Sequence, residues 1–274
     1  MFSTKKRTYK QHYNEKDSFY KYSSPKFTEQ EALSENINTD ICIVGGGLTG
    51  ISAALNLADQ GYDVCILEAN KIGSGASGRN GGQLGIGMRK DQLYLENKFG
   101  FEKAEFFWNV GLDAVKNVTN LISKHNIDCA LKPGILHAGN TKKDYKYFLE
   151  EIEHMKSKYN YDNYEYFDEN AIKDEVNTDQ YYSGLLTKDS FHLNPLKLTY
   201  GLANQCLNKG ISIFENSPID KIEEKDNNIL LFSKNAVIKS KKVIVACNGY
   251  LDNLLGSVSN FFMPINNYII ATEP

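Results

Sequence analysis

The most constraining feature of this 274-residue chain is a glycine-rich turn between two short apolar runs. The first run, residues 41–44, leads into Gly45, Gly47 and Gly50, which have the spacing G-x-G-x-x-G. The second run ends at Glu68, about twenty residues further on. A strand, a glycine turn, a helix and a second strand closed by an acid predict a βαβ unit that binds a dinucleotide.

Each residue of this predicted unit has a physical role. Gly45 makes the tight turn after the strand, and Gly47 lets the backbone approach a pyrophosphate at the start of the next helix. Gly50 lets that helix, predicted over residues 48–60, lie close to the sheet. Glu68 is placed to accept hydrogen bonds from an adenosine ribose. A glycine-rich turn in a sheet protein without a ligand is the alternative interpretation.

Composition narrows the class of protein. The chain is 41% hydrophobic and 24% charged, and its formal net charge of -3 provides no basic patch for nucleic acid. No apolar run approaches the roughly eighteen residues that cross a bilayer, so no membrane partner is expected. Residues 1–35 lack the apolar core of a signal peptide, and the five cysteines include no C-x-x-C pair, which favours a cytoplasmic location. The histidines lack metal-ligand spacing, so no metal is expected.

Further elements follow from periodicity and from capping residues. An amphipathic helix is predicted over residues 101–124, a second helix begins near Asp144, and Asn194 with Pro195 predicts the start of a third. Strands are predicted at residues 211–214, 229–232, 236–239, 242–246 and 268–272. The second and third of these strands suggest a hairpin, and the fourth reads as fully buried.

The loop after Glu68 carries a resemblance to a known family. Residues 73–83 read G-S-G-A-S-G-R-N-G-G-Q, and the strand before them ends in L-E-A. With the glycine turn, this pattern resembles the FAD-dependent oxidoreductases of the D-amino-acid oxidase superfamily, and especially their gamma-glutamylputrescine oxidoreductase branch. Residues 191–195 and 245–250 also resemble later segments of that branch. The loop moves the expected cofactor from NAD to FAD, and an NAD-dependent dehydrogenase is an alternative.

The resemblance implies an α/β fold with a Rossmann-like FAD-binding domain of the D-amino-acid oxidase type and an α+β substrate domain. The family continues beyond Pro274, so the chain is expected to be truncated at its C-terminus, and a second chain is a candidate partner. The implied segments are an N-terminal arm (1–38), two FAD-binding segments (39–90 and 191–264), a substrate-domain segment (91–190) and the start of the substrate-domain sheet (265–274).

The resemblance also implies which residues serve the reaction. His192 is the candidate catalytic residue, and a core or turn histidine is its alternative role. The implied FAD-binding residues are Gly45, Gly47, Leu48, Thr49, Gly50, Glu68, Ala69, Ser74, Gly75, Ala76, Ser77, Arg79, Asn80, Gly81, Gly82, Gln83, Ile219, Ala246, Asn248 and Gly249.

The implied reaction is the oxidation of a small-molecule amine of the gamma-glutamylputrescine type in polyamine breakdown. The amine becomes an imine, water hydrolyses the imine to an aldehyde and ammonia, and dioxygen is reduced to hydrogen peroxide. A sarcosine, glycine or D-amino-acid oxidase is an alternative within the same family. A non-catalytic FAD-binding fragment, or one half of a split enzyme, is an alternative of another class.

Overall fold

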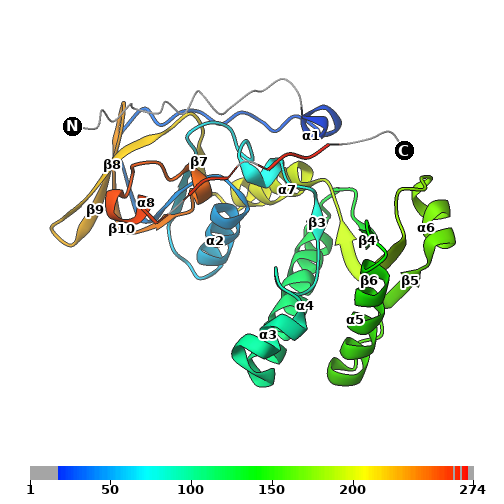
Figure 1. Cartoon of the computed structure of the whole chain (residues 1–274). Helices are drawn as coiled ribbons and strands as arrows, with labels where there is room; N and C mark the ends of the chain where they lie inside the picture. Colours follow the sequence, from blue (N-terminus) through cyan, green and yellow to red (C-terminus); the bar gives the residue numbers. More distant parts are fainter. Residues whose placement is uncertain (1–17, 262, 266, 271–274) are drawn as a thin grey trace, which may run out of the picture. The chain divides into compact units, whose positions relative to one another are not determined.

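The structure is a computed structural model that describes residues 18–261, 263–265 and 267–270. The chain forms two compact units (Figure 1). The described part of unit 1 lies within residues 18–81, 127–129 and 195–270, and unit 2 comprises residues 82–126 and 130–194. In the described part of the chain, no helix combines the length and the apolar character needed to span a bilayer.

Unit 1 is built on a six-stranded sheet. The strand order is β7 (Ser212–Phe214), β2 (Val64–Leu67), β1 (Ile37–Val44), β10 (Val237–Val245), β9 (Asn228–Ser233) and β8 (Ile219–Lys225). The first four strands run parallel, and β9 and β8 extend the sheet in antiparallel fashion. The hairpin predicted between residues 229–232 and 236–239 is confirmed by β9 and the first half of β10, because Val237 pairs with Phe232.

The helices of unit 1 include the one predicted from the glycine turn. Helix α2 (Leu48–Asp59) connects β1 to β2 and packs on α7 (Pro195–Asn208), which begins at Pro195 as predicted. Ile51, Ala54 and Leu55 form the buried face of α2. The remaining helical segments are α1 (Phe19–Ser23), α8 (Gly256–Ser259) and the short 3-10 helices η2 (Ala76–Gly78) and η3 (Asn248–Tyr250).

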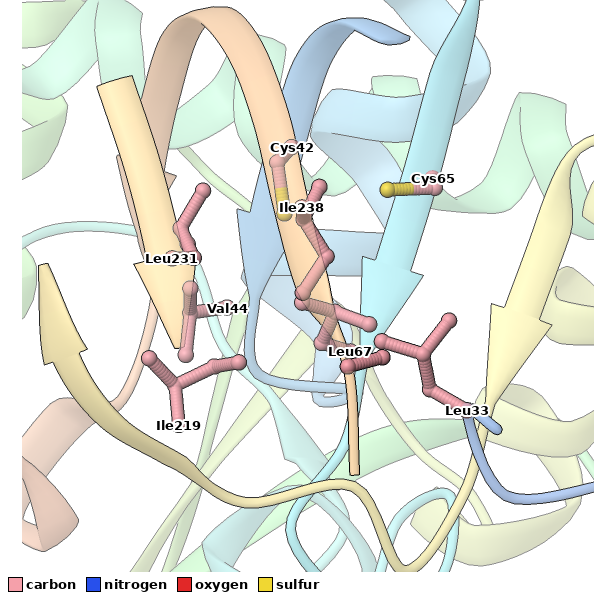
Figure 2. Packing of buried hydrophobic residues seen from close by; sticks show 9 residues of the cluster. Leu33, Cys42, Val44, Cys65, Leu67, Ile219, Leu231 and Ile238 are labelled. Carbon is pink, nitrogen blue, oxygen red and sulfur yellow. The ribbon is translucent and has the colours of Figure 1, made fainter. Parts of the chain in front are cut away.

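Both faces of β2 and of residues 41–44 in β1 are buried, which explains why these segments are continuous apolar runs in the sequence. Ile43 approaches α2, since a Cβ placed on Gly50 would lie 3.1 Å from its Cγ2 atom. On the other face of these two strands, Cys42, Val44, Cys65 and Leu67 belong to a hydrophobic cluster. This cluster also includes residues of β8, β9 and β10 (Figure 2). The cluster contains Leu33, Cys42, Val44, Cys65, Leu67, Ile219, Leu231, Ala236 and Ile238.

The described part of the N-terminal arm is anchored in unit 1. Leu33 is 3% exposed and belongs to the cluster of Figure 2. Its N–H donates to the Ser217 hydroxyl at 2.9 Å, and the Gln30 N–H donates to the Glu215 carboxylate at 3.0 Å. Residues 30–33 therefore attach to the turn between β7 and β8.

Strand β10 corrects two predictions. The separate strands predicted at 236–239 and 242–246 are one strand, because the hydroxyl of the buried Ser240 between them has hydrogen-bond partners: it accepts from the Cys42 N–H at 3.0 Å and donates to the Lys242 carbonyl at 2.6 Å. Residues 243–245 are half-buried rather than fully buried. Strand β9 pairs only with Val237–Ser240 within the described residues, so the second half of β10 has β1 alone as a neighbour.

Unit 2 combines a four-stranded antiparallel sheet with helices. Strand β6 (Ser183–His192) pairs with β4 (Lys132–Gly139), β5 (Tyr164–Phe167) and β3 (Gln83–Leu84). The helices are α3 (Gln92–Phe99), α4 (Phe101–Lys124), α5 (Asp144–Tyr159) and α6 (Glu169–Val176). The predicted helices over 101–124 and from Asp144 are confirmed.

Apart from residues 127–129, which belong to unit 1, the chain passes from unit 1 to unit 2 between residues 81 and 82 and returns to unit 1 between residues 194 and 195. The predicted boundaries between the FAD-binding and substrate-domain segments are 90/91 and 190/191.

Near the C-terminus, Tyr268, Ile269 and Ile270 form no strand, contrary to the strand predicted over 268–272. Tyr268 is 88% exposed and Ile270 is 85% exposed, so neither side chain packs as it would in a strand that covers a core. The rest of that prediction, at residues 271 and 272, lies outside the described residues.

Candidate functional site

The glycine turn after β1 is closed by backbone contacts. Gly45 has φ +118°, and a Cβ placed on it would lie 2.5 Å from the carbonyl oxygen of Ala246. The Gly45 N–H donates to the Leu67 carbonyl at 2.8 Å, so the turn is joined to β2. Both the backbone conformation and the close approach require glycine at this position.

The N-terminus of α2 lies beside Ser77. The Leu48 N–H donates to the Ser77 Oγ at 2.9 Å, and a Cβ placed on Gly47 would lie 2.8 Å from the same oxygen. The first turn of a helix has N–H groups without intrahelical acceptors, and here these belong to residues such as Thr49 and Gly50. The absence of a side chain at Gly47 leaves these donors open to an anionic group.

Gly50 determines how closely α2 approaches the turn. A Cβ at this position would lie 2.0 Å from the Gly45 carbonyl oxygen, a separation that real atoms do not adopt. Gly45, Gly47 and Gly50 therefore form a cradle that a side chain at any of the three positions would fill or distort.

Glu68 follows β2 directly, with both carboxylate oxygens directed at backbone donors. Its Oε2 accepts from the Gly46 N–H at 2.7 Å, and its Oε1 accepts from the Asn70 N–H at 2.8 Å. Burial raises the pKa of the Glu68 carboxyl, and the nearby charge of Glu215 acts in the same direction. A carboxylate has about four acceptor positions, so Glu68 retains capacity for ribose hydroxyls. Ala69 follows in a bend directly after it.

Residues 73–80 form a defined loop around the 3-10 helix η2. The loop is rich in glycine, and it is supported by its own hydrogen bonds and by neighbours within unit 1. Arg79 Nε donates to the Ser74 carbonyl at 2.8 Å, and Asn80 Nδ2 donates to the Ala76 carbonyl at 3.1 Å. A Cβ on Gly75 would lie 3.1 Å from the ring of Tyr250.

The turn after β10 completes this group of segments. Ala246 is the neighbour of Gly45, and Asn248 and Gly249 lie in η3, where Asn248 has φ +49°. The Cys247 thiol donates to the Val44 carbonyl at 3.5 Å. Burial, with a contribution from the charge of Glu68, raises the pKa of Cys247 to about 11, so the thiol is protonated and unreactive at neutral pH.

Unit 1 thus brings together most of the implied FAD-binding residues on three segments, residues 45–50, 68–80 and 246–249. Ile219 begins β8 with its side chain in the core, so only its backbone is available to a ligand. Gly81 is the last residue of this part of unit 1, whereas Gly82 and Gln83 belong to unit 2.

In unit 2, Gln83 is the cross-strand partner of His192, and His192 is also paired with Lys132. The three side chains form one row across the sheet. His192 Nδ1 lies 2.9 Å from the Gly134 carbonyl oxygen. Because a carbonyl only accepts, Nδ1 carries a proton, which leaves Nε2 of the neutral ring as an acceptor.

Sequence reasoning missed Glu215 and Tyr250. Glu215 accepts the Ile72 N–H at 2.7 Å and so supports the segment that follows Glu68. A signal for it exists in the sequence, because both acids follow directly after a short apolar strand, at residues 64–67 and 212–214. Tyr250 lies in the segment 245–250 that resembles the family, but nothing in that segment indicates its contact with Gly75, far away in the sequence.

Comparison with known proteins decides the family. Residues 40–274 match the family described as FAD dependent oxidoreductase. The chain belongs to this family. The family's cofactor is FAD, and the glycine cradle, the open helix N-terminus and Glu68 fit such a dinucleotide. Within the described residues there is no group of three or more His, Cys, Asp or Glu side chains that could hold a metal ion.

Individual relatives agree with the family, and one solved structure is similar in fold. The chain is 35% identical over 257 residues to gamma-glutamylputrescine oxidoreductase of Escherichia coli (strain K12), covering 93% of this chain and 60% of the relative. It is 32% identical over 261 residues to the probable oxidoreductase OrdL of Haemophilus influenzae, covering 94% of this chain and 61% of the relative. The solved structure of L-amino acid deaminase from Proteus myxofaciens is similar in fold, with a TM-score of 0.65 and 21% identity. The match covers 85% of this chain and 51% of the deaminase chain. The chain therefore spans about three fifths of the length of the curated relatives it matches.

Proposed function

We propose that this chain oxidises the carbon–nitrogen bond of a small-molecule amine of the gamma-glutamylputrescine type. The observation that carries the proposal is the 35% identity to gamma-glutamylputrescine oxidoreductase over 93% of this chain. The expected overall reaction converts the amine, dioxygen and water to an aldehyde, ammonia and hydrogen peroxide.

When bound, FAD supplies the two-electron acceptor that turns the amine into an imine. The chain's own groups bind and orient it. The N–H groups of Thr49 and Gly50 at the start of α2 are proposed to donate to the pyrophosphate, with the Ser77 hydroxyl beside them. Glu68 is proposed to accept from the adenosine ribose while it keeps its bond to the Gly46 N–H. The other implied residues of 74–83 and 246–249 are proposed to line the remainder of the cofactor.

His192 is the proposed residue on the substrate side. It is the cross-strand neighbour of Gln83, and the segment of Gln83 is the one that the family resemblance places beside the flavin ring. With its proton held on Nδ1 by the Gly134 carbonyl, the ring offers Nε2 to the substrate nitrogen. A neutral substrate amine that donates an N–H to this acceptor is oriented in the protonation state that reacts, so no protein group has to take a proton first.

The test is an anaerobic titration of the FAD-loaded chain with gamma-glutamylputrescine, followed by the visible absorbance of the flavin. Loss of the absorbance with this substrate, and not with sarcosine, glycine or D-alanine, supports the proposal. If the flavin absorbance is lost with only one of the three control amines, that amine replaces gamma-glutamylputrescine as the proposed substrate. If it is lost with none of the amines, the result contradicts amine oxidation by this chain.

A variant of His192 tests its proposed role separately. His192→Gln keeps a side chain of similar reach but removes the ring nitrogens, so we expect slower flavin reduction with unchanged FAD binding. His125→Gln, at the C-terminal end of α4, is the matched control. An unchanged reduction rate in His192→Gln would leave the histidine as a structural residue of the sheet.

A further inference from the structure

Glu215 is a buried acid that the proposed reaction does not use. It is 1% exposed and follows β7 directly. The register of β2 and β7 ends at the pair Leu67 and Phe214, so Glu68 and Glu215 continue two adjacent parallel strands side by side. A carboxylate is rarely buried this completely unless hydrogen bonds and a counter-charge compensate it.

The Glu215 carboxylate has such compensation, and it comes from two distant parts of the chain. Its Oε1 accepts from the Ile72 N–H at 2.7 Å, and its Oε2 accepts from the Gln30 N–H at 3.0 Å. Lys71 Nζ lies 3.4 Å from Oε2 and 3.3 Å from Glu29 Oε1. One side chain therefore ties the N-terminal arm to the segment after Glu68.

The segment held by Glu215 supports the glycine turn. Ile72 is 1% exposed and packs against Gly46. A Cβ placed on Gly46 would lie 2.5 Å from the Cδ1 atom of Ile72. The Gly73 N–H donates to the Gly46 carbonyl at 3.2 Å, and the Gly46 N–H donates to Glu68. The contacts thus run without a break from Glu215 through Ile72 and Gly46 to Glu68.

We infer that Glu215 is a positioning residue for FAD binding, whose carboxylate holds residues 70–73 and the arm at residues 29–33 so that Gly46 and Glu68 keep their places. The inference rests on the proposed binding of FAD at the glycine turn. Ser217 reinforces the same arrangement, because its hydroxyl accepts the Leu33 N–H at 2.9 Å and donates to the Glu215 carbonyl at 2.9 Å.

The chemistry requires a carboxylate rather than an amide. Both oxygens of Glu215 face backbone N–H donors, and one of them also faces an ammonium group. A glutamine has one acceptor oxygen and one NH₂ donor, so either orientation of its amide sets a donor against a donor. Glu215→Gln therefore keeps the size of the side chain while it releases either Ile72 or Gln30.

The experiment compares Glu215→Gln with Glu224→Gln in the full chain. Glu224 lies on β8 and is exposed, so the control makes the same change of charge away from the turn. The first measurement is amide hydrogen exchange at Gln30, Gly46, Ile72 and Gly73 without added FAD, and the second is the dissociation constant of FAD from the quenching of its fluorescence. We expect Glu215→Gln to raise exchange at Ile72 or Gln30, and at Gly46 or Gly73, about tenfold or more and to weaken FAD binding about tenfold, whereas Glu224→Gln changes neither.

The two measurements separate the inference from the function on which it rests. Faster exchange at Ile72 or Gln30 with an unchanged FAD dissociation constant would overturn the inference, because Glu215 would then only anchor the arm. If the unaltered chain binds no FAD, the proposed function fails; faster exchange at Gly46 and Gly73 in Glu215→Gln would still support the positioning role, and unchanged exchange there would overturn it.

A second variant covers the case in which Glu215→Gln does not fold. Lys71→Met keeps both backbone hydrogen bonds to Glu215 and removes only the ammonium group. We expect this variant to fold and to bind FAD several-fold more weakly, because the buried carboxylate loses its counter-charge. An FAD dissociation constant equal to that of the unaltered chain would overturn the inference.

Discussion

The glycine turn of unit 1 and the centre of unit 2 are each stabilised by internal contacts, and the kind of contact differs between the two regions. In unit 1, backbone atoms approach backbone atoms, as where Gly45 meets the carbonyl of Ala246, and the side chains that hold the turn bond to backbone N–H groups, as Glu68 does to Gly46. In unit 2, tyrosine hydroxyls meet carboxylates: Tyr159 donates to Glu96 at 2.7 Å, and Tyr161 donates to Asp189. A site built from backbone groups, such as the glycine turn, needs glycines at fixed spacings, so it can be recognised in the sequence. We call the glycine turn the backbone site. A network of side chains leaves no such pattern.

The network of unit 2 surrounds a small aromatic core. Trp108 lies edge-on to Tyr161, with ring centroids 4.9 Å apart, and both side chains are buried. Burial and the hydrogen bond to Glu96 raise the pKa of Tyr159 to about 12, and burial also raises the pKa of Tyr161 and Tyr164. These phenols stay protonated at neutral pH and act as hydrogen-bond donors.

The most damaging single change should be Gly50→Ala in the backbone site. The new Cβ would lie 2.0 Å from the Gly45 carbonyl oxygen, so either α2 or the turn must move. We expect the free energy of unfolding to fall by about 3 kcal/mol and FAD binding to be lost. Thermal unfolding and flavin retention measure both effects.

The control for this change is Gly256→Ala, where nothing lies within 4 Å of an added Cβ. It should alter neither stability nor FAD binding. Normal stability and normal FAD binding in Gly50→Ala would mean that the close backbone approach is not what holds the site.

The side-chain network should respond to Tyr161→Phe with a smaller loss. The hydroxyl is removed from Asp189, which then keeps the Asn163 side-chain amide at 3.2 Å as a remaining donor. We expect a loss of about 2 kcal/mol, typical of a hydrogen bond to a charged group. Trp108 is the chain's single tryptophan, so its fluorescence during urea unfolding reports on unit 2.

Tyr145→Phe is the matched control, since Tyr145 is 48% exposed. Equal unfolding midpoints for the two tyrosine variants would show that the hydroxyl of Tyr161 contributes no more than one at the surface, and the contrast between the units would then lose its energetic basis.

The same contrast explains what could be predicted from the sequence. The turn, the helix after it and the position of Glu68 followed from glycine spacing and from apolar runs, and the helix over 101–124 followed from its periodicity. The short helices α3 and α6 were not predicted, although Asp91 and Asp168 cap them with side-chain acceptors. Too few residues follow each cap for a periodicity to develop.

Contacts between residues far apart in the chain were beyond reach. Tyr159 and Glu96 are 63 residues apart, and Glu215 and Gln30 are 185 apart, so no local pattern connects either pair. Strand β10 was divided in two because a polar Ser240 interrupts its apolar pattern, and only the structure shows that the Cys42 N–H satisfies this hydroxyl.

Glu68 offers a pH test of the backbone site. Burial raises its pKa in the folded chain above the ordinary value, so the stability that it contributes is present below the unfolded pKa and is lost as the pH rises through the folded pKa. We expect the unaltered chain without FAD to lose stability, relative to Glu68→Gln, as the pH rises above about 4.3. Melting temperatures of both proteins between pH 4 and pH 8 measure the difference, and a constant difference would contradict the raised pKa.

The smallest effect belongs to an exposed contact between the middle of β1 and the middle of β10. The hydrogen bond from Lys241 Nζ, 2.6 Å from Asp40 Oδ1, lowers the pKa of Asp40, and the Asp63 N–H at 3.2 Å acts in the same direction. A lowered folded pKa gives stability that is present above the unfolded pKa and is lost as the pH falls through the folded one.

Lys241→Met should therefore move the carboxyl titration of Asp40, followed by NMR, toward higher pH, while Lys239→Met on the same strand leaves it in place. The remaining bond from Asp63 should keep the midpoint below the ordinary value in Lys241→Met. Because exposed ion pairs contribute little to stability, the melting temperature of Lys241→Met should stay close to that of the unaltered chain at neutral pH. A marked fall would mean that side-chain contacts support the strands of unit 1 as strongly as they support unit 2.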